Sequence, residues 1–144
     1  MIPYGKQTIT QEDIDAVVET LKADFLTQGP QVPLFEQSVA EYCQAKYAFA
    51  MNSATSALHV ACLALGLGEG DWLWTSPITF LASSNCALYC GAQVDFVDID
   101  PATYNLCPKA LEKKLLEAEK GGRLPKIVNS LIFLVVRDSN NFNL

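Results

Sequence analysis

The apolar residues at the start of the chain recur with the spacing of amphipathic helices. A first helix is predicted from Thr10-x-x-Asp13, which is a capping-box-like start, and its apolar stripe is Ile14, Val17, Val18 and Leu21. Gly-Pro at positions 29–30 interrupts this pattern. A second amphipathic helix is predicted over residues 33–44, and the side chains that we expect it to bury are Leu34, Phe35, Val39 and Tyr42.

From residue 47 onward, short apolar runs alternate with longer helical segments. The runs predicted as strands are residues 47–51, 72–75 and 94–99, and a fourth apolar run covers residues 126–136. The predicted helices are residues 54–65, 79–90 and 108–120. Strands that alternate with helices of this length indicate a parallel sheet with helices on both faces, so the predicted fold class is α/β.

Composition and charge narrow the classes of function. A chain of 144 residues, half of them hydrophobic, can build one globular domain. The net charge of −6 argues against a nucleic-acid partner, which would need a basic face. Apolar stretches stay well below the roughly 20 residues of a membrane span, and residues 1–6 do not have the pattern of a signal peptide. Five cysteines, an odd number scattered through apolar segments, fit a reducing cytoplasm better than disulfides or a zinc site.

One junction has the composition of a phosphate site. Residues 52–58 read Asn-Ser-Ala-Thr-Ser-Ala-Leu and join a predicted strand to a predicted helix. The free amides of a helix start, with the hydroxyls of Thr55 and Ser56, could hold a phosphate. Ser53 could equally be a simple helix cap. The glycine patterns of dinucleotide folds and P-loops are absent from the sequence.

Three further candidates admit plain structural explanations. Phe80 follows the next predicted strand and could stack on a planar ring, or it could belong to the core. Asp95, Asp98 and Asp100 form an acidic run that could be solvated or could cap a turn. His59 lies within a predicted helix and is better explained as a packed histidine than as a base.

Five motifs in order resemble the DegT/DnrJ/EryC1/StrS sugar aminotransferases. They are residues 1–7 (MIPYGKQ), 24–30 (DFLTQGP), 52–59 (NSATSALH), 75–80 (TSPITF) and 94–100 (VDFVDID). The resemblance covers roughly residues 1–128. It implies part of the large domain of a fold type I enzyme that depends on pyridoxal 5'-phosphate (PLP).

The resemblance also implies roles for residues of the cofactor and substrate sites. The expected cofactor residues are Ser53, Ala54, Thr55, Ser56 and Phe80, with Ala54 and Thr55 on the phosphate and Phe80 on the pyridine ring. The expected substrate residues are Tyr4, Thr27, Gln28 and Gly29, which would face a sugar nucleotide across a homodimer interface. The implied reaction transfers an amino group from glutamate to C4 of a UDP-4-keto-6-deoxy-N-acetylhexosamine.

The catalytic groups of such enzymes are expected outside this chain. The Schiff-base lysine and the aspartate that pairs with the pyridine nitrogen belong to the next segment of the family, so no residue here is assigned as catalytic. We therefore expect a fragment that does not retain PLP and is inactive alone. The alternative is a non-catalytic remnant or a small phosphate- or nucleotide-binding α/β module.

The sequence departs from the family pattern after residue 128. We expect three parts, which are an arm with the first helix and substrate loop (1–30), part of the large domain (31–128) and an aberrant tail (129–144). A shifted reading frame of the tail can encode the family's expected loop, so a frameshift is the preferred explanation and a genuine divergent terminus is the alternative. DNA sequence beyond codon 128 distinguishes them. A sheet without its remaining strands is expected to be marginally stable or to associate.

Overall fold

The computed structural model describes residues 5–130 and the backbone of residues 133–136. The chain divides into two compact units, Met1–Ala50 and Met51–Leu144, and each is described by itself. Tyr4, predicted as a substrate residue, and most of the predicted aberrant tail (129–144) lie outside the described residues. Within those residues, no helix is both long and apolar enough to cross a membrane.

The first unit contains two helices, α1 (Gln11–Lys22) and α2 (Gln31–Tyr42). The predicted capping box at the start of α1 is confirmed, because the Thr10 amide donates to Asp13 Oδ2 at 2.8 Å and the Asp13 amide donates to Thr10 Oγ1 at 3.4 Å. The predicted burial along the second helix is wrong. Leu34, Phe35 and Tyr42 are exposed and Val39 is only half-buried, since nothing in this unit covers that face of α2.

The strand predicted over residues 47–51 is not formed. This segment has no strand partner in the described part of the chain. Instead, the Ala50 amide donates a hydrogen bond to Glu36 Oε1 on α2 at 2.8 Å. Tyr47 and Phe49 stack on each other with ring centroids 6.4 Å apart and both stay exposed. Apolar composition alone does not make a strand when no neighbouring strand pairs with it.

The second unit is built on a sheet of order β2-β1-β3-β4. Strand β1 (Trp72–Thr75) pairs in parallel with β2 (Gln93–Phe96) on one side and β3 (Ile127–Ser130) on the other, so the predicted parallel arrangement is confirmed for three strands. Strand β4 (Phe133–Val136) adds to β3 in the antiparallel direction. The fourth apolar run of the sequence is therefore a pair of strands.

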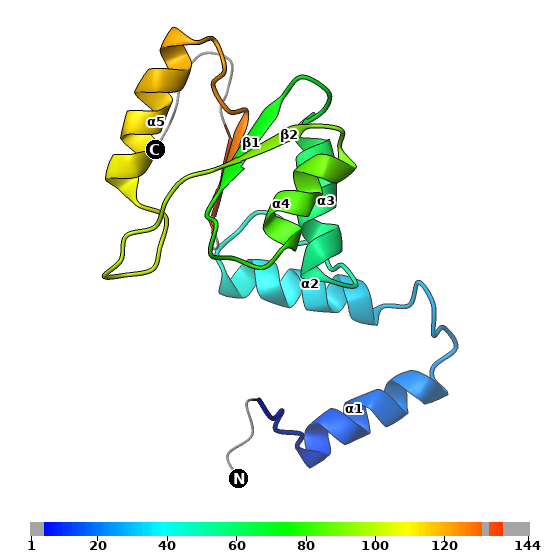
Figure 1. Ribbon diagram of the computed structural model, residues 1–144. Helices are drawn as coiled ribbons and strands as arrows, with labels where there is room; N and C mark the ends of the chain where they lie inside the picture. The colour runs from blue at the N-terminus through cyan, green and yellow to red at the C-terminus, as the bar shows by residue number, and fades with distance from the viewer. Residues whose placement is uncertain (1–4, 131–132, 137–144) are drawn as a thin grey trace. The chain divides into compact units, whose positions relative to one another are not determined.

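Helices cover both faces of this sheet (Figure 1). Helices α3 (Ala54–Ala64) and α4 (Ala82–Tyr89) pack against each other and against the face that carries Leu73 and Ile127, both fully buried. Helix α5 (Pro108–Lys120) lies over the opposite face of the sheet. Because side chains alternate along a strand, Trp72 and Trp74 of β1 both lie on this face. The predicted helices 54–65 and 108–120 are confirmed, whereas α4 begins three residues later than predicted.

The amino edge of the sheet is held by one lysine. Lys126 Nζ, just before β3, donates to the Gly66 carbonyl at 2.6 Å and to Asp71 Oδ2 at 2.9 Å. The same carboxylate oxygen accepts from the Gly68 amide at 3.0 Å. The loop between α3 and β1 is therefore tied to the start of β3, and its turn uses the positive φ of 69° at Gly66.

Candidate functional site

The N-termini of α3 and α4 lie at the same edge of the sheet. Helix α4 follows the carboxyl end of β1, so it begins at that edge. Helix α3 runs into the amino end of β1 through the loop that Lys126 ties down, so its own N-terminus lies at the carboxyl edge. In open α/β sheets this edge is where ligands bind.

The first turn of helix α3 has a side-chain cap, but some of its backbone amides have no hydrogen-bond acceptor among the described residues. Ser53 is the N-cap, with φ −162° and ψ 156°, and its Oγ accepts from the Ser56 amide at 3.1 Å while donating to Ser56 Oγ at 3.1 Å. The Ala57 amide donates to the Ser53 carbonyl at 3.0 Å. Among the described residues the Ala54 and Thr55 amides, the first two of the helix, have no acceptor. They are the two donors that a phosphate would need.

Replacing Ser53 with alanine is expected to lower the free energy of unfolding of the Met51–Leu144 unit by about 1 kcal/mol. The physical reason is that the Ser56 amide loses its acceptor at the helix start. Urea unfolding followed by circular dichroism measures the change. Ser53→Asn, which keeps an N-cap oxygen, is the matched control and should stay near wild type. Equal losses in both variants would show that the cap does not stabilise this helix.

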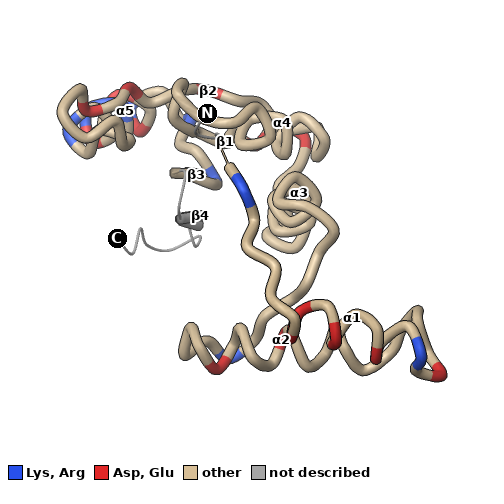
Figure 2. The backbone as a smooth tube through the Cα atoms, turned by 90° about the horizontal axis from the view of Figure 1, so that it is seen from below, with Lys and Arg blue, Asp and Glu red and all other residues tan. Residues whose placement is uncertain are grey.

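The electrostatics of this edge favour an anion. Neither α3 nor α4 contains a charged residue, and neither has an acidic side chain in its first turn. Figure 2 shows both helices without charged positions, whereas α1 and α5 each carry acidic and basic residues. The positive ends of the two helix dipoles are therefore not neutralised by their own helices, although the whole chain has a net charge of −6.

Phe80 lies in the loop between β1 and α4 rather than inside the helix, and its side chain is 76% exposed. The core explanation for this residue is therefore excluded in the described structure. An exposed aromatic ring at the carboxyl edge is available to stack on a planar group.

Three polar contacts that the sequence did not indicate hold this loop. The Ser76 Oγ accepts from the Ile78 amide at 3.3 Å, and the hydroxyls of Thr79 and Ser83 are 3.0 Å apart. Asn129 Nδ2, buried on β3, donates to the Ser83 carbonyl at 3.3 Å. The signal that could have found the hydroxyl pair is the i,i+4 spacing of Thr79 and Ser83 across a helix start, but Asn129 becomes its neighbour only through the sheet.

The predicted substrate loop belongs to the Met1–Ala50 unit. Gln28 has a φ of 54°, which is rare for a residue other than glycine. A Cβ at Gly29 would lie 2.6 Å from the Phe25 carbonyl oxygen, so only glycine fits there without a backbone shift. The loop containing Thr27, Gln28 and Gly29 thus has a conformation that its residues fix locally. Its place relative to the α3 turn stays a prediction.

The acidic run after β2 does not form a single cluster. Asp100 caps a turn, accepting from the Ala102 amide at 2.8 Å, and Asp98 Oδ1 accepts from the Ile99 amide at 2.8 Å. Asp95 instead pairs with Lys114 on α5 at 2.7 Å. His59 is half-buried and lies edge-on to Tyr89, with ring centroids 5.2 Å apart, as expected for a packed histidine.

The Asp95–Lys114 pair makes the stability of the second unit dependent on pH. Burial raises the pKa of Asp95, but the hydrogen bonds from Lys114 and the Phe96 amide and the Lys114 charge together outweigh it, so the pKa lies below its ordinary value of 3.8. A depressed folded-state pKa contributes stability that is present above the unfolded pKa and is lost as pH falls through the folded pKa.

We therefore expect the difference in unfolding free energy between wild type and Asp95→Asn to be constant above roughly pH 5 and to shrink as the pH falls below about 4. Because the Asp95 side chain is 46% exposed, the difference should be small and should decrease with salt. Urea unfolding at several pH values measures it. A difference that grows toward acid pH would contradict the assigned direction.

The described fold is an α/β segment in which two amides at the start of α3 have no acceptor among the described residues. The comparison with known proteins identifies its class. A family model described as the DegT/DnrJ/EryC1/StrS aminotransferase family matches residues 7–121, and the chain belongs to this family. The resemblance noted in the sequence is confirmed.

Particular relatives agree with this assignment. The chain is 47% identical over 117 residues to the UDP-4-amino-4,6-dideoxy-N-acetyl-beta-L-altrosamine transaminase of Campylobacter jejuni, covering 81% of this chain and 31% of the relative. It is 40% identical over 99 residues to the GDP-perosamine synthase of Caulobacter vibrioides, covering 68% and 27%. A Streptococcus pneumoniae structure described as a sugar aminotransferase in its PLP form aligns with a TM-score of 0.74 and 32% identity, covering 78% and 29%. The chain thus spans about a third of the length of these relatives.

The described residues fit the cofactor of this family, which is PLP in the intact enzymes. PLP combines a dianionic phosphate with a planar aromatic ring. The α3 turn offers two amide donors at a positive helix end, and Phe80 offers an exposed ring at the same sheet edge.

Proposed function

We propose that this chain is the N-terminal segment of a PLP-dependent sugar-nucleotide aminotransferase, which transfers an amino group from glutamate to C4 of a UDP-4-keto-6-deoxy-N-acetylhexosamine. The observation that carries the proposal is the α3 turn, whose Ala54 and Thr55 amides have no acceptor among the described residues. The sugar assignment rests on the name of the Campylobacter jejuni relative, which describes a 4-amino-4,6-dideoxy product. The corresponding pathway is that of pseudaminic acid.

In this proposal the chain binds and orients the cofactor from one side. Ala54 and Thr55 donate their amides to the phosphate, with the hydroxyls of Ser53 and Ser56 adjacent. Phe80 stacks on the pyridine ring, and the contacts of Thr79 and Asn129 with Ser83 keep its loop in place. PLP, when bound, supplies the electron sink for transamination.

The substrate is proposed to contact the first unit. Tyr4, Thr27, Gln28 and Gly29 would face the sugar nucleotide, and the family likeness suggests that they do so across a homodimer interface. The positive φ of Gln28 and the tight approach of Gly29 to Phe25 support a preformed loop, which keeps the entropy cost of binding low.

The chain is proposed to be inactive alone and not to retain PLP. The lysine that bonds to the cofactor and the acid that pairs with its ring nitrogen are expected in the part of the family's length that this chain does not span. Within the described residues, Lys114 and Lys126 are engaged in ion pairs on other parts of the sheet. Neither lysine is assigned to the cofactor.

A chimera tests the substrate proposal. Residues 1–128 of this chain would be joined to the part of the Campylobacter jejuni relative that lies beyond its match, and amino-sugar product would be measured by mass spectrometry. With glutamate and a UDP-4-keto-6-deoxy-N-acetylhexosamine we expect product from the chimera and none from the 144-residue chain. The GDP-linked 4-keto sugar should give at least tenfold less, because recognition of the correct groups is worth more than 1.4 kcal/mol.

The possible outcomes separate the two levels of the proposal. A chimera that holds PLP but prefers the GDP-linked sugar would overturn the substrate and leave the aminotransferase assignment standing. A folded chimera without PLP would favour the alternative, a non-catalytic phosphate- or nucleotide-binding module.

A further inference from the structure

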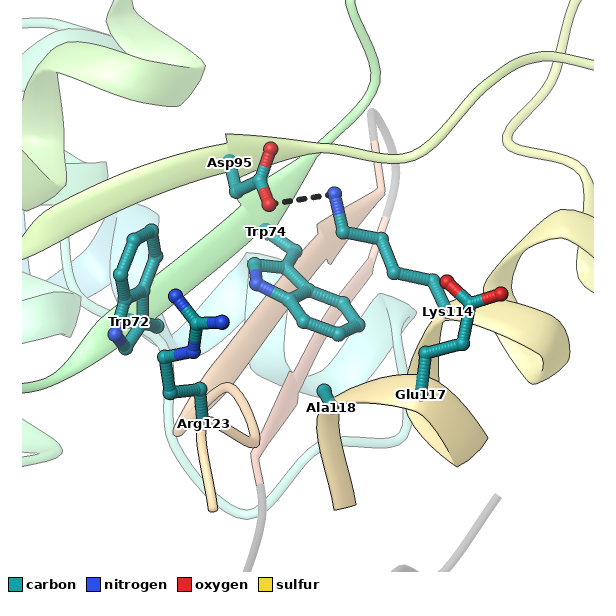
Figure 3. A pocket seen from close by; sticks show the side chains of 7 residues that line it. All are labelled: Trp72, Trp74, Asp95, Lys114, Glu117, Ala118 and Arg123. Atoms are coloured by element: carbon teal, nitrogen blue, oxygen red, sulfur yellow. Dashed lines mark ion pairs between the residues drawn. The ribbon is translucent and has the colours of Figure 1, made fainter. Parts of the chain in front are cut away.

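A pocket of about 220 Å³ lies between the sheet and α5. It is on the opposite face of the sheet from α3 and α4, and it shares no residue with the proposed cofactor turn. The side chains that define it are Trp72, Trp74, Asp95, Lys114, Glu117 and Arg123 (Figure 3). Nothing in the proposed transamination uses these groups.

Two indole rings form the wall of the pocket. Trp74 is 2% exposed, and Trp72, two residues earlier on the same face of β1, is half-buried. These are both tryptophans of the chain. Trp74 is nearly covered and lies beneath the Lys114 ammonium, so the half-buried Trp72 indole is the ring that a ligand can contact. Its apolar surface suits the face or edge of an aromatic ring.

The two cationic side chains at the pocket differ in whether they already have hydrogen-bond or ion-pair partners. Lys114 Nζ is held by Asp95 Oδ2 at 2.7 Å and by the Phe96 carbonyl at 2.6 Å, and it lies 4.9 Å from the centre of the Trp74 ring. Arg123 has no ion pair and no side-chain hydrogen bond to the rest of the described structure. In Figure 3 its guanidinium points toward the space between the two indoles.

We propose that this pocket binds a small aromatic carboxylate, with its ring against Trp72 and its carboxylate on Arg123. The planar guanidinium matches a carboxylate in a bidentate geometry, with two parallel N–H···O hydrogen bonds. Lys114 cannot replace Arg123 in this role, because Asp95 already neutralises it.

Two features set the orientation and size of the ligand. Glu117 lies beside Lys114 and away from Arg123 in Figure 3, so the anionic end of the ligand must be at the Arg123 end. The volume of about 220 Å³ is below the lower end of drug-sized pockets, so it admits a single ring with its carboxylate rather than a whole nucleotide.

The test uses the 144-residue chain and benzoate as the probe. Because the chain has two tryptophans, its spectrum contains an indole N–H signal for each, and Trp72→Phe assigns them. Benzoate should shift both signals saturably, with a dissociation constant in the millimolar range for so small a ligand. Benzamide, the neutral isostere, should bind about tenfold more weakly, since it loses the charge-assisted hydrogen bonds.

Two variants decide whether Arg123 is the anchor. Arg123→Gln should weaken benzoate about tenfold and abolish its advantage over benzamide. Lys120→Gln removes the same charge from an exposed position at the end of α5 that does not line the pocket, and it should leave the affinity unchanged. Shifts that never saturate, or equal affinities for benzoate in wild type and Arg123→Gln, would overturn the proposal.

Discussion

Replacing Leu73 with alanine is expected to lower the free energy of unfolding of the Met51–Leu144 unit by about 3 kcal/mol. Leu73 is fully buried at the centre of β1, the strand that pairs with both β2 and β3. Its side chain belongs to a cluster with residues of α3, α4 and β3, namely Cys62, Cys86, Ala87 and Ile127. Removing it leaves a cavity that strands fixed on both sides cannot close.

The matched control for this prediction is Leu63→Ala on α3. The chemical change is the same, but Leu63 is 53% exposed and alanine is the better helix former, so the unfolding free energy should change by less than about 1 kcal/mol. Urea unfolding of both variants, followed by circular dichroism, measures the two values. Similar losses at the two sites would mean that the unit does not have the core described for it.

Replacing Lys126 with methionine is expected to lower the same free energy by about 1–2 kcal/mol. Methionine keeps most of the side-chain volume but removes the donor to the Gly66 carbonyl and to Asp71. The Asp71 carboxylate would then retain only the Gly68 amide as a donor. Both charged side chains are about a third exposed, so water compensates in part and the loss is smaller than for a fully buried pair.

A double-mutant cycle isolates this interaction. Asp71→Asn alone should be destabilising, and its effect should become smaller when Lys126 is already methionine, because the two residues act as one network. Lys113→Met, on the exposed side of α5, is the control for loss of a positive charge and should have little effect. Additive effects of the Asp71 and Lys126 changes would show that the ion pair does not stabilise the amino edge of the sheet.

The elements that could be predicted from the sequence are those whose signals are local. The Thr10 and Asp13 capping box, the Ala- and Leu-rich run of α3 and the start of α5 at Pro108 each act within one or two helical turns. The run Trp72–Thr75, predicted as a strand, is followed by Pro77, which ends the apolar run locally. Their bounds agree with the structure to within one or two residues.

The errors concern features that depend on distant partners. Residues 47–51 have the composition of a strand, but in the described structure no strand pairs with them. The apolar face of α2 was expected to be buried, and no element of its unit covers Leu34 or Phe35. The antiparallel direction of β4 relative to β3 is likewise not encoded in the apolar pattern of the two strands. The hydrophobic pattern predicts which face of a helix or strand is apolar, but it does not predict which other element packs on that face.

In the candidate site, too, the features set by neighbouring residues could be predicted, and those set by distant residues could not. The α3 turn could be predicted, because a serine N-cap and two free amides are consequences of a few consecutive residues. The contact of Asn129 with the Ser83 carbonyl joins residues 46 positions apart and needed the sheet register. The pocket between Trp74 and α5 likewise arises from strands and a helix that are separate in sequence.

The phosphate role of the α3 turn can be tested without disturbing the helix. Thr55→Asp places a carboxylate at the positive end of α3, which stabilises a helix but repels a phosphate. Thr55→Asn has nearly the same shape without the charge.

The most direct measurement is the PLP content of the chimera that carries residues 1–128 of this chain, compared among wild type, Thr55→Asp and Thr55→Asn. If this chain supplies the phosphate side of the cofactor site, the wild-type chimera should retain a stoichiometric amount of PLP through gel filtration. Thr55→Asn should retain most of it, and Thr55→Asp should lose it while unfolding at the same or a higher urea concentration. A folded chimera that holds PLP equally well with aspartate at position 55 would contradict the account.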